Sequence, residues 1–152
     1  MPFPNLFTKE ESELIIKRID SLGNSSPASW GKLDTSQMFS HCNVTYEMIY
    51  TDKHPKPNFL MSIMIKRFIQ SKVVSETPYT KNGPTVPAFV ITDKKEFDAE
   101  KNPLIEHIRK NQELRAQYFD GEELHSLGPL NTLEWNNMMN KHLDHHLKQF
   151  RV

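Results

Sequence analysis

The chain has 152 residues but only one cysteine, Cys42, so it cannot form an internal disulfide bond. A lone cysteine fits a reducing compartment. Residues 1–5 lack the charged and apolar regions of a secretory signal, and no apolar run approaches the about 20 residues that span a bilayer. We therefore expect a cytoplasmic protein with no membrane-spanning segment.

An excess of charge of either sign is also absent, because 19 Lys and Arg residues balance 19 Asp and Glu residues. No basic stripe interleaved with aromatic residues is present, so nucleic acid and an anionic membrane surface are poor candidate partners. The hydrophobic content of 37% and the charged content of 25% are ordinary for a globular protein. At this length we expect one domain, residues 1–152.

Capping patterns and apolar spacing predict helices in the first half of the chain. The pattern at 8–11 opens a helix that ends near Gly23, and the pattern at 34–37 opens a second helix over 35–51. A further helical segment is expected over 57–74, with a proline in its first turn.

The second half begins with residues 75–92, whose three prolines and one glycine predict a long crossover loop that covers a site. The capping pattern at 93–96 predicts a helix that reaches about residue 118, with Pro103 either kinking it or lying near its start. A last helix, capped at residue 131 or 132, extends to residue 149. The expected fold class is all-α.

The last of these helices carries three histidines. Residues four apart lie on one face of a helix, so His142 and His146 can direct ring nitrogens toward one point. At about 100° per residue the two share a narrow arc with Trp135 and Met139, whereas His145 falls roughly 80–100° to one side. This arrangement favours a metal site with a ligand from elsewhere.

His41 flanks the apolar stripe of the helix expected over 35–51, which makes it the natural third ligand. One divalent ion would satisfy buried imidazoles that otherwise each need a polar partner. The residues alone leave a second interpretation open, in which each histidine is a hydrogen-bonded core residue. For a metal site of this kind, zinc or nickel suits the nitrogen ligands best.

Three stretches of the sequence carry a further signal. They are Trp-Gly-Lys-Leu at 30–33, Ser-Gln-Met-Phe-Ser-His-Cys at 36–42, and the stretch 128–150 with its His-x-x-His-His-x-x-Gln pattern. Together they resemble a branch of the DinB-like superfamily that is a domain of unknown function. The resemblance implies a four-helix bundle with an additional helical segment. It also implies a divalent metal held by His41, His142 and His146, with His145 as a non-ligating neighbour.

Related members of that superfamily act on a low-molecular-weight thiol. The resemblance therefore implies a metal-dependent transferase that joins a small thiol to an electrophile, using an open ligand position. The alternative is a non-enzymatic metal-binding or ligand-binding protein that forms a homodimer through an exposed helix face.

Other chemistry can be weighed from the residues. A zincin protease needs Glu directly after the first histidine of the pair, where Leu143 stands, so that mechanism is excluded. Cys42 is expected to be a buried, inert thiol rather than a nucleophile. His125 falls in a turn before the last helix, where it could border a cleft. No catalytic residue beyond the ligands can be named.

Overall fold

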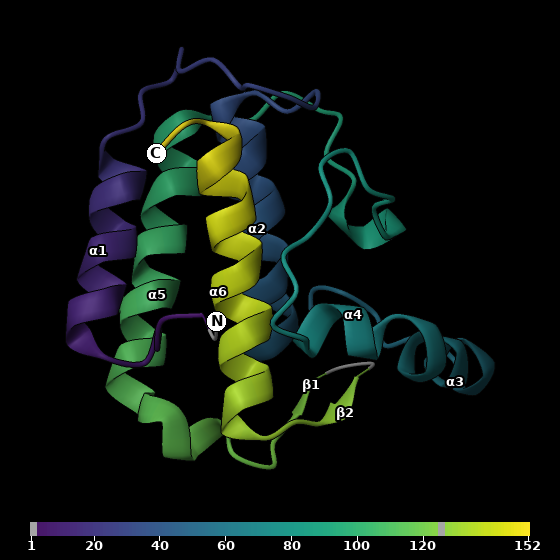
Figure 1. Ribbon diagram of the computed structural model, residues 1–152. Coiled ribbons are helices and arrows are strands. Elements are labelled where there is room, and N and C mark those ends of the chain that lie inside the picture. Colours follow the sequence, from purple (N-terminus) through teal and green to yellow (C-terminus); the bar gives the residue numbers. More distant parts are fainter. Residues whose placement is uncertain (1–2, 125–126) are drawn as a thin grey trace.

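The computed structural model describes residues 3–124 and 127–152. Four long helices lie side by side as a bundle (Figure 1). They are α1 (Lys9–Asp20), α2 (Thr35–Tyr50), α5 (Phe97–Phe119) and α6 (Thr132–Gln149). The expectation of an all-α fold is confirmed.

The remaining elements are short. A side arm beside α2 and α6 holds α3 (Phe59–Phe68) and α4 (Gln70–Val74), and the 3-10 helix η1 (Pro87–Phe89) follows in the long connection to α5. Two residue pairs, β1 (Glu123–Leu124) and β2 (Gly128–Pro129), form a small antiparallel hairpin. This hairpin was not expected, and it occupies the predicted turn before α6.

Side-chain caps fix the starts of α1, α2 and α6 where the sequence predicts them, whereas α5 begins three residues later than its predicted cap at Asp93, with Glu96 as the N-cap instead. Asp34 and Gln37 form a reciprocal capping box at α2, in which the Asp34 carboxylate accepts from the Gln37 backbone N–H at 2.8 Å. Thr8 accepts from Glu11 at the start of α1. Asn131 caps α6.

Two helices differ from the expected boundaries. The segment expected over 57–74 is two helices, because the chain bends at Ile69 so that α4 can bring Val73 and Val74 against the core. Helix α5 continues through Pro103, and its non-helical backbone lies instead at Arg115, where φ is 64°.

The core fills the space between the four long helices. Its largest fully buried side chains include Trp135 of α6, Phe39 of α2, Phe119 of α5 and Ile15 of α1. Burial of this apolar surface is the main force that holds the bundle together. In the described ranges, every helix is too short or too polar to cross a bilayer.

Candidate metal centre

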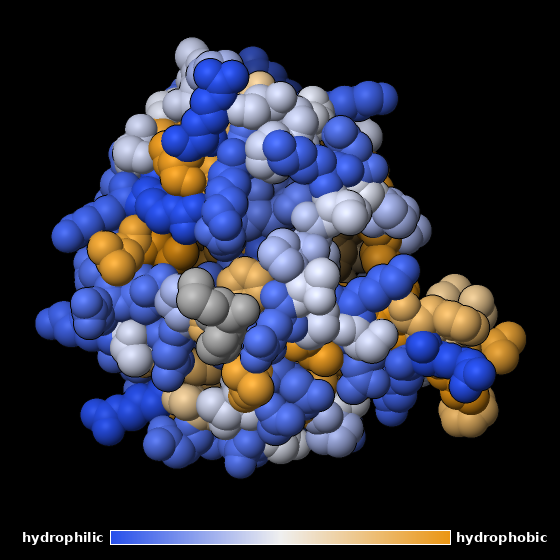
Figure 2. All heavy atoms as spheres, in the orientation of Figure 1, coloured by the Kyte–Doolittle hydropathy of each residue, from blue (hydrophilic) through white to orange (hydrophobic). Residues whose placement is uncertain are grey.

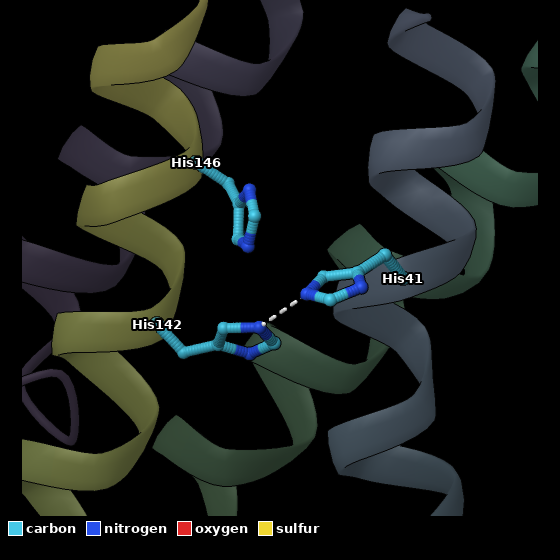
Figure 3. A group of neighbouring side chains, drawn as sticks. All are labelled: His41, His142 and His146. Carbon is cyan, nitrogen blue, oxygen red and sulfur yellow. Dashed lines mark hydrogen bonds between the residues drawn. The ribbon is translucent and has the colours of Figure 1, made fainter. Parts of the chain in front are cut away.

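Helices α2 and α6 bring three histidines of distant sequence together inside the bundle (Figure 3). One ring nitrogen each of His41, His142 and His146 lies within 4.8 Å of the other two. The closest approach is 2.9 Å, between the Nε2 atoms of His142 and His41, which are 101 positions apart in the chain. The structure thus assembles the three residues that the sequence singles out.

The shared arc of α6 accounts for this placement. Met139 and Trp135 on the same arc are fully buried, which fixes the rotation of α6 about its axis. His142 and His146, one and two turns further on, then face α2. His41 meets them from the second turn of α2 and is itself buried.

Two of the imidazoles are held in a single tautomer. Nδ1 of His41 lies 2.7 Å from the carbonyl oxygen of Phe89, and Nδ1 of His146 lies 2.9 Å from Oε1 of Gln149. Because each partner is an acceptor, each Nδ1 must carry the proton and donate it. Both Nε2 atoms are therefore left with a free lone pair.

The hydrogen-bond partner of the third imidazole is compatible with either of its tautomers. Nδ1 of His142 lies 3.0 Å from the hydroxyl of Thr45, and a hydroxyl can donate or accept. In the structure, Nε2 of His142 must donate across the 2.9 Å contact to the lone pair on Nε2 of His41. If the Nε2 lone pair is needed elsewhere, the proton can move to Nδ1 and be accepted by Thr45.

Gln149 supports His146 in one orientation only. Its Nε2 donates to the carbonyl oxygen of Trp30 at 2.6 Å, so Oε1 must face the histidine as an acceptor. Gly31 makes this approach possible, because its φ is +78° and a Cβ atom there would lie 2.5 Å from Nε2 of Gln149. The stretch at 30–33 therefore packs directly behind a proposed ligand.

Burial keeps the cluster neutral. It lowers the pKa of His41, and it lowers the pKa of His146 to about 3. The pKa of His142 lies well below its ordinary value, mainly through burial and further through the neighbouring His41 and His146. Near pH 7 all three imidazoles are neutral, the form in which histidine binds a metal.

The three nitrogens fit a divalent ion. Ligand nitrogens at about 2.0–2.1 Å from a tetrahedral ion stand about 3.3 Å apart. The observed separations of 2.9 Å and up to 4.8 Å bracket that value. Among the described residues, no cysteine or carboxylate joins the cluster. Asp144, midway in the sequence between His142 and His146, forms ion pairs with Arg18 and Lys148.

The other residues weighed from the sequence lie outside the cluster. The ring of His145 contacts the rings of Trp30 and Tyr79, with centroids 6.0 and 5.7 Å away. Cys42 is buried, and burial raises its pKa far above the ordinary range, as expected of an inert thiol. His125 lies outside the described residues.

Sequence reasoning missed the groups that orient the imidazoles. Thr45 lies four positions after His41, and Gln149 lies three after His146, so helical spacing could have pointed to both. Phe89 acts through its backbone carbonyl, in η1 of the long connection. No side-chain pattern reveals such a contact.

A cleft of about 110 Å³ lies beside His145, and its lining does not include His41, His142 or His146. It is lined by His145, whose ring centroid lies 5.0 Å from that of His146, and by residues 78, 79 and 81 of the long connection. Its charged lining consists of Lys81, Lys141, Lys148 and Asp144. The cleft is small, and its charges are already engaged: Lys148 pairs with Asp144, and the Lys141 ammonium donates to the carbonyl oxygens of Lys72 and Ser75.

The comparisons with known proteins give a family without a known activity. Neither a curated protein nor a solved structure matches the chain. A family model matches residues 7–152, nearly the whole chain, and no finding joins this family to the DinB-like superfamily, so that resemblance stays a prediction. The chain belongs to the family described as protein of unknown function (DUF1569).

Proposed function

We propose that His41, His142 and His146 bind one divalent ion, zinc or nickel, and that the protein is a metal-dependent transferase acting on a low-molecular-weight thiol and an electrophile. The observation that carries the metal site is the convergence of three neutral imidazoles whose Nδ1 atoms are all engaged elsewhere. Only the Nε2 atoms remain for a ligand. Partners of this kind orient metal-binding histidines in proteins.

The supporting residues have distinct roles in this proposal. The carbonyl of Phe89 and the amide of Gln149 hold His41 and His146 in the binding tautomer before any ion arrives. Thr45 lets His142 switch tautomer without leaving a buried N–H unpaired. The site therefore needs little rearrangement to bind.

Three protein ligands leave a position for a substrate. Gln149 and Asp144, two nearby side chains that could close it, are both occupied by other partners. A bound ion would act as a Lewis acid that lowers the pKa of a thiol. A cytoplasmic location would keep small cellular thiols reduced.

The second candidate is a non-enzymatic metal-binding protein. It is favoured by the composition of the cluster, because no carboxylate among the described residues joins the histidines as a general base. The two candidates differ in whether a thiol reaches the ion.

Cobalt substitution tests the thiol directly. The cobalt-loaded protein should develop a sulfur-to-metal charge-transfer band when a low-molecular-weight thiol is added, because a thiolate changes the ligand set. His142→Ala should lose the band, and His145→Ala, a neighbour outside the cluster, should keep it. Cobalt that binds at these histidines but gives no band with thiol would favour the non-enzymatic candidate.

A further inference from the structure

Helix α3 projects from the bundle with its apolar side chains in water. None of its residues is buried, and Figure 2 shows the corresponding hydrophobic protrusion beside the bundle. The exposed fractions of its six large apolar side chains range from 46% at Ile63 to 83% at Phe59. The six are Phe59, Leu60, Met61, Ile63, Met64 and Phe68, which we call the α3 patch.

The α3 patch surrounds most of the helix. Only Ser62 and Ile65, on the side that faces the rest of the chain, are partly covered within α3. A helix that is apolar on most sides is normally buried in protein. A helix that lies on a membrane surface has instead a polar face opposite its apolar one.

The area of the α3 patch matches a protein interface. For side chains of roughly 200 Å² each, the exposed fractions leave on the order of 700 Å² of apolar surface in water. The largest exposed apolar patch of an ordinary monomer is about 300–600 Å². A specific interface buries about 800 Å² on each partner.

Charges beside the α3 patch are of both signs. Lys66 and Arg67 are the charged residues of α3, and Glu123 of the adjacent hairpin and Glu122 just before it are exposed. The two elements lie close together, because a Cβ atom at Gly128 would lie 3.1 Å from Nζ of Lys66. A two-fold interface requires such self-complementarity, with each basic group facing the partner's acidic group. An anionic bilayer would be repelled by the two glutamates.

We propose that a second copy of this chain covers the α3 patch in a two-fold symmetric dimer. Each α3 packs against the partner's α3, and Lys66 and Arg67 of one copy face Glu122 and Glu123 of the other. The proposal is independent of the metal site, which lies inside the bundle of one chain.

The mass of the full-length protein in solution tests the dimer. Light scattering after gel filtration at micromolar concentration should give twice the 17.8 kDa of one chain. The double variant Phe59→Glu with Leu60→Glu should raise the dimer dissociation constant at least about 30-fold, since buried anchors carry most of the affinity. Leu14→Glu, on an exposed apolar residue of α1, is the matched control and should leave the dimer intact.

A charge exchange tests the two-fold arrangement. One variant carries Lys66→Glu and Arg67→Glu, and a second carries Glu122→Lys and Glu123→Lys. Each alone should be mainly monomeric through like-charge repulsion, and an equimolar mixture should form a mixed dimer in which both contacts are again complementary.

Several results would overturn the proposal. A standard interface has a dissociation constant well below about 100 μM, so a wild-type protein that stays monomeric up to that concentration would exclude the dimer. A dimer that is unaffected by the changes at Phe59 and Leu60 would place the interface elsewhere. Binding of a monomeric protein to phosphatidylserine vesicles, lost in that double variant, would assign the α3 patch to a membrane.

Discussion

The histidine cluster and the α3 patch each place side chains in an environment that does not suit them: polar imidazoles are buried in the first, and apolar side chains are exposed to water in the second. In the cluster, buried polar rings have a partner for each Nδ1 atom, supplied by Phe89, Thr45 and Gln149. In α3, six large apolar side chains remain between about half and four-fifths exposed to water. Within the cluster, this chain itself supplies the hydrogen-bond partners of the Nδ1 atoms, and only the Nε2 atoms remain for a ligand. For the α3 patch, we propose that the covering surface comes from a second copy of the chain.

The difference shows how a single fold separates two tasks. The cluster forms only when α2, α6 and the long connection are packed together, because His41 and His142 are 101 positions apart in the chain. Helix α3 supplies no residue to the cluster, and its six large apolar side chains lie outside the core. We therefore expect an exposed side chain of α3 to be replaceable with little effect on the cluster, and the predictions below use that difference.

The largest expected contrast is in stability. Leu143→Ala, a buried change beside His142, should lower the unfolding free energy by about 2–5 kcal/mol through loss of packing and a cavity. The same change at the exposed Leu60 should alter it by less than about 0.5 kcal/mol in the monomer. Urea unfolding at low protein concentration measures both. Equal losses would show that α3 packs on the bundle.

A smaller effect is expected on metal affinity when the support of His146 is removed. Gln149→Leu should weaken binding about 10–100-fold, because the Nδ1–H loses its acceptor. Gly31→Ala should act in the same direction by displacing the Gln149 amide. Lys148→Ala, the exposed neighbour, is the control. Titration against a zinc indicator would contradict this role if Gln149→Leu and Lys148→Ala bound equally well.

The hydroxyl of Thr45 should matter about 10-fold in affinity. Thr45→Val keeps the shape but removes the acceptor for His142 Nδ1–H, whereas Thr45→Ser keeps the hydroxyl. The same titration should find the valine variant weakened and the serine variant near wild type. Equal affinities for the two would rule out the tautomer role.

The sequence could predict the cluster better than it could predict the surroundings. The four-residue spacing of His142 and His146, and the buried arc with Met139, follow from helical geometry alone. The position of Phe89 could not be derived, because a long connection with few apolar anchors has many possible paths. The apolar pattern of α3 likewise predicted a helix but not its exposure, since periodicity shows which residues seek burial and not what buries them.

The smallest expected effect is a pH dependence outside both regions. Burial lowers the pKa of His107, which stacks on Tyr46 with ring centroids 5.2 Å apart. In the unfolded chain His107 therefore binds a proton more readily than in the folded protein. Its contribution to the free energy of unfolding is complete above about pH 6.5 and is lost as the pH falls below that value. His107→Phe keeps the stacking and should reduce the loss of stability between about pH 7 and pH 5. An unchanged pH profile in chelator-treated samples would contradict this.

The central claim is tested most directly by metal stoichiometry. Elemental analysis after loading with zinc and removal of excess should find one ion per chain in the wild type and in His145→Ala. The variant with alanine at residues 41, 142 and 146 should bind none while keeping the helical circular dichroism of the bundle, whose apolar core is independent of the site. A folded triple variant that binds zinc with wild-type affinity would show that these histidines are not the metal site.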